Sequence, residues 1–62
     1  MNQVAVVIGG GQTLGAFLCR GLATEGYRVA VVDIQSDKAA NVAQEINAEF
    51  GEGTAYGFCA DA

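Results

Sequence analysis

The sequence predicts an α/β fold in which strand, helix, strand, helix and strand follow one another. Two apolar runs, residues 4–8 and 29–32, are nearly continuous, which is typical of strands in a parallel sheet. Glycines follow the first run, and apolar residues with helical spacing follow both runs. A chain of 62 residues with this pattern is expected to form one small unit around a three-stranded parallel sheet.

The first strand is expected over residues 4–9 and the first helix over residues 14–25. The hydroxyl of Thr13 suits an N-cap, and Gly26 lies where a left-handed C-terminal cap is expected. Gly21 lies on the inner face of this helix, which predicts close packing against a strand. The apolar stripe predicted to face the sheet consists of Leu14, Phe17, Leu18 and Leu22.

The second helix is expected from residue 36 to about residue 50, with Ser36 or Asp37 as its N-cap. Gly51 and Gly53 are expected to end it. Its predicted buried stripe consists of Ala39, Val42, Ala43, Ile46 and Phe50.

The second strand is expected over residues 28–33 and the third over residues 54–59. Right-handed crossovers in the strand order 3-2-1 place both helices on the same face of the sheet. The other face then has no helix in this sequence to cover it. Since a parallel sheet uncovered on one face is not stable in water, we expect either self-association or the N-terminal part of a longer protein.

Four glycines, Gly9, Gly10, Gly11 and Gly15, lie where the first strand leads into the first helix. Glycine lets backbone N–H groups approach an anion closely, and a helix N-terminus favours negative charge. Asp33 ends the second strand, 24 residues after Gly9. A glycine loop, a helix and a strand-end carboxylate together predict a Rossmann-type dinucleotide site, in which the acid accepts hydrogen bonds from the adenosine ribose.

Asp33 favours NAD over NADP, because a 2′-phosphate would meet a like charge and Ile34 offers no arginine to offset it. Ile34 itself is expected either on the adenine face or in the core. A tight turn that binds nothing is the alternative for the glycines, and a solvated strand end is the alternative for Asp33. A methyltransferase can also use a glycine loop and a strand-end acid, but the dinucleotide spacing argues against it. A P-loop is excluded because no Gly-Lys-Ser/Thr follows.

Residues 8–15, Ile-Gly-Gly-Gly-Gln-Thr-Leu-Gly, lie where short-chain dehydrogenases/reductases carry T-G-x-x-x-G-x-G, and the chain resembles that family throughout. Ile8 replaces the usual threonine and Thr13 the middle glycine. Residues 60–62 resemble the Asp-Val pair that contacts the adenine, which implies that role for Asp61; a frayed terminal residue is the alternative. The cofactor contacts implied by the resemblance are Gly9, Gly11, Gln12, Thr13, Leu14, Gly15, Asp33, Ile34 and Asp61.

The resemblance covers only the first quarter of a typical family member, so residues 1–62 are expected to be a partial dinucleotide-binding domain of an NAD-dependent oxidoreductase. The family's catalytic Tyr-x-x-x-Lys pair has no counterpart, because neither Tyr27 nor Tyr56 has a lysine four residues later. We therefore expect no catalytic residue here and no dehydrogenase activity from this chain alone. A non-catalytic, self-associating fragment that acts through protein interaction is the alternative.

The composition argues against several other functions. The net charge is −4 with only three scattered basic residues, which argues against nucleic acid or an anionic membrane as a partner. The chain has no histidine, and Cys19 and Cys59 are widely spaced, so no metal site is expected. We expect both to be buried, reduced thiols in a cytoplasmic protein. The five-residue apolar run near the N-terminus is too short for a signal peptide or a membrane span.

Overall fold

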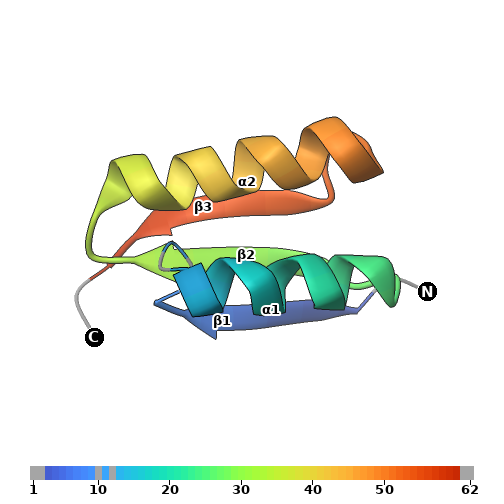
Figure 1. Ribbon diagram of the computed structural model, residues 1–62, viewed down its shortest axis with the longest axis horizontal. Coiled ribbons are helices and arrows are strands. Elements are labelled where there is room, and N and C mark those ends of the chain that lie inside the picture. Colours follow the sequence, from blue (N-terminus) through green and yellow to red (C-terminus); the bar gives the residue numbers. More distant parts are fainter. Residues whose placement is uncertain (1–2, 10, 12, 61–62) are drawn as a thin grey trace.

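The computed structural model describes residues 3–9, 11 and 13–60, which form a layer of two helices on a three-stranded sheet (Figure 1). The elements in chain order are β1 (Val4–Ile8), α1 (Thr13–Thr24), β2 (Arg28–Asp33), α2 (Ser36–Phe50) and β3 (Ala55–Cys59). The predicted order is confirmed, and the bounds differ from the expected ones by no more than one residue.

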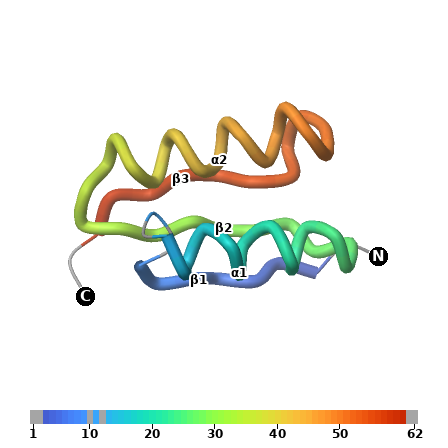
Figure 2. Tube along the Cα trace, in the orientation of Figure 1, coloured from blue at the N-terminus to red at the C-terminus, as the bar shows by residue number. Residues whose placement is uncertain are grey.

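The sheet is parallel throughout, with β2 between β1 and β3. Both helices lie on the same face of it: α1 runs along β1 and β2, and α2 runs along β2 and β3 (Figure 2). This is the arrangement predicted from right-handed crossovers that step in one direction. Neither helix in the described part of the chain is long and apolar enough to cross a membrane.

The core lies between the helices and the covered face of the sheet, with α2 providing the larger share. The predicted stripe of α2 is confirmed for four of its five members, but Phe50 is exposed. Phe50 is the last residue of α2 and lines a surface depression together with residues that precede β2 and β3. The buried apolar residues are Val7, Cys19, Ala23, Val29, Val31, Ala39, Val42, Ala43, Ile46 and Ala55.

The predicted inner face of α1 is wrong for three of its four members, and only Leu22 packs on the core. Leu14 and Phe17 are 80% and 76% exposed, and Leu18 is also exposed. An alanine Cβ at Gly21 would meet nothing within 4 Å, so the predicted close packing there is wrong as well. α1 has apolar residues on nearly all sides, and its smaller side chains allow the closer approach to the sheet. The buried or partly buried side chains of α1 that pack on the core are Ala16, Cys19, Leu22 and Ala23.

The helix ends were predicted with mixed success. Gly26 has φ of 96° and follows α1 as the expected left-handed residue. The N-cap residue of α2 is Gln35, and no side chain caps the helix, so the prediction of Ser36 or Asp37 is wrong. The turn before α2 is held instead by Asp33, whose Oδ1 accepts a hydrogen bond of 2.9 Å from the Gln35 backbone N–H.

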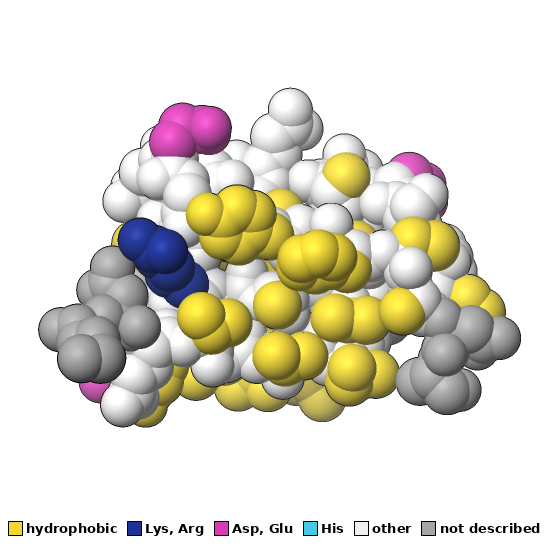
Figure 3. Space-filling view, turned by 180° about the vertical axis from the view of Figure 1, so that it is seen from behind, with side chains coloured by type: hydrophobic (Ala, Val, Ile, Leu, Met, Phe, Trp, Pro, Cys, Tyr) yellow, Lys and Arg dark blue, Asp and Glu magenta, His cyan; other side chains and the backbone are white. Residues whose placement is uncertain are grey.

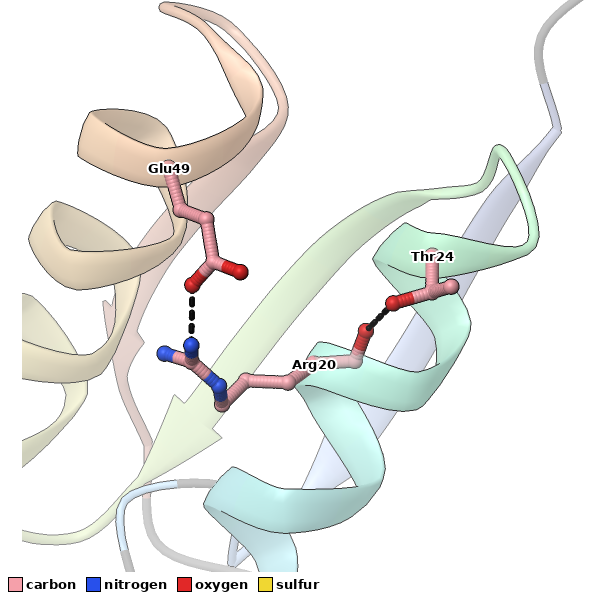
Figure 4. A network of polar contacts seen from close by, with 3 residues as sticks. All are labelled: Arg20, Thr24 and Glu49. Atoms are coloured by element: carbon pink, nitrogen blue, oxygen red, sulfur yellow. Dashed lines mark hydrogen bonds and ion pairs between the residues drawn. The ribbon is translucent and has the colours of Figure 1, made fainter.

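Polar side chains join the elements at two further points. Asn47 in α2 holds the start of β3: its Nδ2 donates to the carbonyl of Ala55 at 2.9 Å, and its Oδ1 accepts from the Ala55 N–H at 2.8 Å. Arg20 in α1 forms an ion pair with Glu49 in α2, while the Arg20 carbonyl accepts a hydrogen bond from the Thr24 hydroxyl (Figure 4). Together these contacts fix α2 against β3 and tie the two helices to each other.

The face of the sheet turned away from the helices carries a broad apolar patch (Figure 3). Val4, Val6 and Ile8 of β1 are 62–63% exposed, and Tyr56 and Phe58 of β3 are about half exposed. Alternation along each strand puts these side chains opposite the buried ones. The prediction that only one face is covered is therefore confirmed for the described residues. We call this surface the open face.

Candidate functional site

The carboxyl ends of the three parallel strands lie at one edge of the sheet, and the glycine loop leaves from that edge (Figure 1). Ligands of parallel α/β sheets bind outside this edge. Gly9 follows β1 directly with φ of 78°, a conformation that L side chains rarely adopt, and its N–H donates to the Val32 carbonyl at 2.6 Å. Nothing lies within 4 Å of where its Cβ would be, so the loop begins beside open space.

Position 11 requires glycine because its neighbours leave no room for a side chain, and not because of its backbone conformation. An added Cβ would lie 2.8 Å from the Cβ of Lys38, 2.9 Å from Oδ2 of Asp33 and 3.1 Å from the backbone N of Ala39. The Gly11 N–H itself donates to Oδ2 of Asp33 at 3.1 Å. The loop therefore lies directly against the first turn of α2, and a larger residue at this position would push the two apart.

Asp33 connects three segments at the edge of the sheet. Its side chain is buried, and its two carboxylate oxygens accept hydrogen bonds from the N–H groups of Gly11 and Gln35. Its backbone carbonyl accepts a further hydrogen bond of 3.1 Å from the N–H of Ala60, just after β3. A buried carboxylate is stable only with such donors, and by accepting from them Asp33 holds the glycine loop and the turn before α2 in place. Sequence reasoning missed this second role.

The first turn of α1 completes the anion-binding side of the candidate site. α1 begins at Thr13, and its first turn contains Leu14 and Gly15 but no acidic side chain. The first N–H groups of a helix lack partners within the helix and favour a negative charge. The structure thus brings Gly9, Gly11 and this helix start to the same edge of the sheet.

The adenine side of the candidate site is described only in part. Ile34 is 61% exposed, so the alternative of a core residue is excluded and its side chain offers an apolar surface. Gln12 and Asp61, both predicted to contact the cofactor, lie outside the described residues, and Gly10 does too.

Two residues that the sequence did not single out lie beside this edge, Lys38 and Cys59. Cys59 pairs with Asp33 in the strand register, and its thiol donates to the Ile34 carbonyl at 3.4 Å. Both cysteines are free, but the prediction of burial is wrong for Cys59, which is the last residue of β3 and is exposed. Cys19 is buried as expected, and burial raises the pKa of its thiol.

A surface depression of about 290 Å³ lies at the opposite edge of the sheet. It is lined by residues around the starts of β2 and β3, including Tyr27, Arg28 and Thr54, and by none of the predicted site residues. Since the amino ends of parallel strands are not where such sheets bind ligands, we assign the site to the glycine loop. Among the residues that the structure describes, no cluster of side chains could hold a metal ion.

Comparison with known proteins identifies the family of the chain. The short chain dehydrogenase family matches residues 3–62. Over its 62 residues the chain is 90% identical to sorbitol-6-phosphate 2-dehydrogenase of Escherichia coli K12, of which it spans 24%. A crystal structure of sorbitol-6-phosphate 2-dehydrogenase from Erwinia amylovora superposes with a TM-score of 0.88 at 61% identity, over 90% of this chain and 22% of that one.

A more distant structure shares the fold alone. Menthone neomenthol reductase from Mentha piperita superposes with a TM-score of 0.85 at 22% identity, over 98% of this chain and 22% of that one. The chain therefore spans less than a quarter of the length of each of these relatives. With the βαβαβ arrangement, the glycine loop and the family match together, the chain belongs to the short-chain dehydrogenase family.

Proposed function

We propose that residues 1–62 are the NAD-binding N-terminal segment of an oxidoreductase that interconverts sorbitol 6-phosphate and fructose 6-phosphate. The observation that carries the cofactor proposal is the buried carboxylate of Asp33 at the end of β2, 3.1 Å from the Gly11 backbone nitrogen. The substrate proposal rests on the 90% identity to a protein with that name.

The residues present fit a dinucleotide. Gly9 borders open space at the start of the loop, and no acidic side chain lies in the first turn of α1 to repel a pyrophosphate. Gly9, Gly11 and Gly15 would hold the pyrophosphate through backbone N–H groups, and Asp33 would accept hydrogen bonds from the ribose hydroxyls. When bound, NAD supplies the hydride acceptor.

The proposal places the adenine beside Ile34, whose exposed side chain would pack on the ring, and beside Asp61. It favours NAD over NADP because Asp33 would repel a 2′-phosphate. The acid/base group that the chemistry requires is proposed to lie outside residues 1–62. A cytoplasmic location is proposed as well, since both cysteines are free.

Calorimetric titration of the chain with NAD, NADP and S-adenosylmethionine tests the cofactor. We expect NAD to bind more tightly than the other two. Tighter binding of NADP would refute the role of Asp33, and a preference for S-adenosylmethionine would favour a methyltransferase.

A chimera tests the rest of the proposal in the context of a whole enzyme. Residues 1–62 would replace the matching N-terminal quarter of the Escherichia coli relative, and oxidation of sorbitol 6-phosphate would be followed through NADH absorbance. We expect an active chimera and no activity from the 62-residue chain. A folded chimera that neither binds NAD nor oxidises the substrate would refute the proposal.

The open face supports a second part of the proposal, which concerns what covers it. We propose that further chain of the same enzyme packs on Val6, Ile8 and Phe58, because the solved relative extends far beyond the part that matches.

In isolation the 62-residue chain is then expected to self-associate through this face, as measured by light scattering, and V6K should reduce the association. A well-folded monomer would refute the argument that the open face must be covered. Self-association without NAD binding would favour a non-catalytic interaction fragment.

A further inference from the structure

The three basic side chains of this acidic chain lie in three different places. Arg20 is paired with Glu49 between the helices (Figure 4). Arg28 begins β2, at the amino edge of the sheet. Lys38 lies in the first turn of α2, which contacts the glycine loop at the carboxyl edge. Only Lys38 is therefore placed to meet a ligand held by that loop.

The position of Lys38 is fixed by the packing around Gly11. A Cβ added at Gly11 would lie 2.8 Å from the Cβ of Lys38 and 2.9 Å from Oδ2 of Asp33, so all three groups border the same point. Lys38 is exposed, and its ammonium is carried on a flexible four-carbon stem. The other charged groups of this region are acidic: Asp33 at the end of β2, and Asp37, exposed on α2.

An anionic dinucleotide would therefore approach an edge with two described carboxylates and one cation. Asp33 is suited to ribose hydroxyls but repels a phosphate in the same place. A lysine ammonium attracts phosphate as a point charge, without the fixed geometry of arginine. Asp33 and Lys38, which carry opposite charges, thus both border the loop at Gly11.

We propose that Lys38 is the residue that attracts the phosphates of the dinucleotide to this site. The proposed function already assigns the exclusion of a 2′-phosphate to Asp33, and Lys38 would accept that phosphate once the carboxylate is removed. This inference rests on the proposed function of the chain as a dinucleotide-binding segment.

The first test uses single substitutions at exposed positions, measured by calorimetry with NAD. K38Q is expected to weaken NAD binding about two- to fivefold, as for an exposed ion pair, and the difference should shrink as salt is raised. R28Q is the matched control, because it removes the same charge five residues from Asp33 along β2. That separation is about 17 Å, well beyond a Debye length of about 8 Å at physiological salt, so R28Q should bind NAD as the unchanged chain does.

The second test uses NADP. D33S is expected to bind NADP more tightly than the unchanged chain, and D33S/K38Q should lose most of that gain. Circular dichroism shows whether each variant keeps its fold, because Asp33 also holds the loop. If D33S unfolds, the comparison of K38Q with R28Q decides the question without it.

The outcomes separate this inference from the function on which it depends. Weaker binding by K38Q alone, with the expected salt dependence, supports the role of Lys38. Equal NAD affinity in K38Q and the unchanged chain, or an equal loss in R28Q, would overturn it and leave the dinucleotide site standing. No binding of NAD or NADP by the unchanged, folded chain would overturn both.

Discussion

Replacing Gly57 by alanine is expected to destabilise the chain, because β3 and α2 touch through their backbones at this point. A Cβ on Gly57 would lie 3.0 Å from both the carbonyl carbon and oxygen of Ala39, and 3.1 Å from the nitrogen of Ala40. These are helix backbone atoms, which cannot move aside as the end of a flexible side chain can. Accommodating the methyl group requires α2 to shift away from β3.

The magnitude follows from two opposing terms. Overpacking of this kind costs about 1–3 kcal/mol. Replacing glycine in a strand recovers roughly 0.5–1 kcal/mol of backbone entropy. Mid-range values of the two terms give a net loss of about 1 kcal/mol, with an upper limit of about 2.5 kcal/mol, which is a large part of the roughly 3–9 kcal/mol typical of a domain of this size. Since the displaced turn of α2 also contacts Gly11, NAD binding should weaken in the same variant.

Urea unfolding followed by circular dichroism measures the change, and Gly21→Ala provides the matched control. The same methyl group at Gly21 meets nothing within 4 Å and lies within a helix, so it should raise the free energy of unfolding by up to about 1 kcal/mol. The two substitutions are thus expected to have opposite signs. A stability of G57A within about 0.5 kcal/mol of the unchanged chain, or a loss of stability in G21A, would refute the packing argument.

Three further predictions concern stability. Asn47→Ala should lower the free energy of unfolding by about 1–3 kcal/mol in the same urea experiment, because it removes both hydrogen bonds to the start of β3; N47D, which sets a carboxylate oxygen against the Ala55 carbonyl, should also be destabilised. Burial raises the pKa of the Cys19 thiol above its ordinary value of 9.0, so the unfolded chain loses this proton first, and stability should fall as the pH rises above 9.0. C19A should reduce that fall, and an identical pH profile would contradict the assignment. The exposed pair of Arg20 and Glu49 should show a coupling energy below about 1 kcal/mol in a double-mutant cycle, and a larger value would show that the pair is more shielded from water than its exposure indicates.

The order and bounds of the elements were predictable because their signals are local. Continuous apolar runs mark β1 and β2, and glycines with positive φ, such as Gly26 and Gly51, mark the turns that follow the helices. The one covered face was predictable as well, since it follows from the handedness of the two crossovers.

The inner face of α1 was not predictable from spacing alone. Leu14 and Phe17 give a stronger apolar stripe than Cys19 and Ala23, yet the smaller pair packs on the sheet. Periodicity reports which residues share a helix face, but it does not report which face allows the closer approach to its neighbour.

The sequence predicted which residues belong to the candidate site, but it did not predict the contacts that hold them together. The sequence singled out Gly9, Gly11 and Asp33, and the structure brings them to one edge. The hydrogen bond between Gly11 and Asp33 joins residues 22 positions apart, and the contact of Lys38 with the loop depends on how α2 docks. Neither contact can be predicted from the local sequence, because each forms only when separate elements pack together.

The unpaired side of β1 has a consequence for how stability and cofactor affinity are linked. In the described chain β1 pairs with β2 alone, so its other side presents backbone N–H and C=O groups without strand partners. Doubly wound sheets open their ligand crevice where the strand order reverses, next to the strand that carries the glycine loop. If the proposed function holds, the described residues would build one wall of that crevice, and a parallel strand added to β1 would build the other. Any segment that pairs there would both stabilise the sheet and complete the crevice, so occupancy of that edge and occupancy of the proposed cofactor site should favour each other.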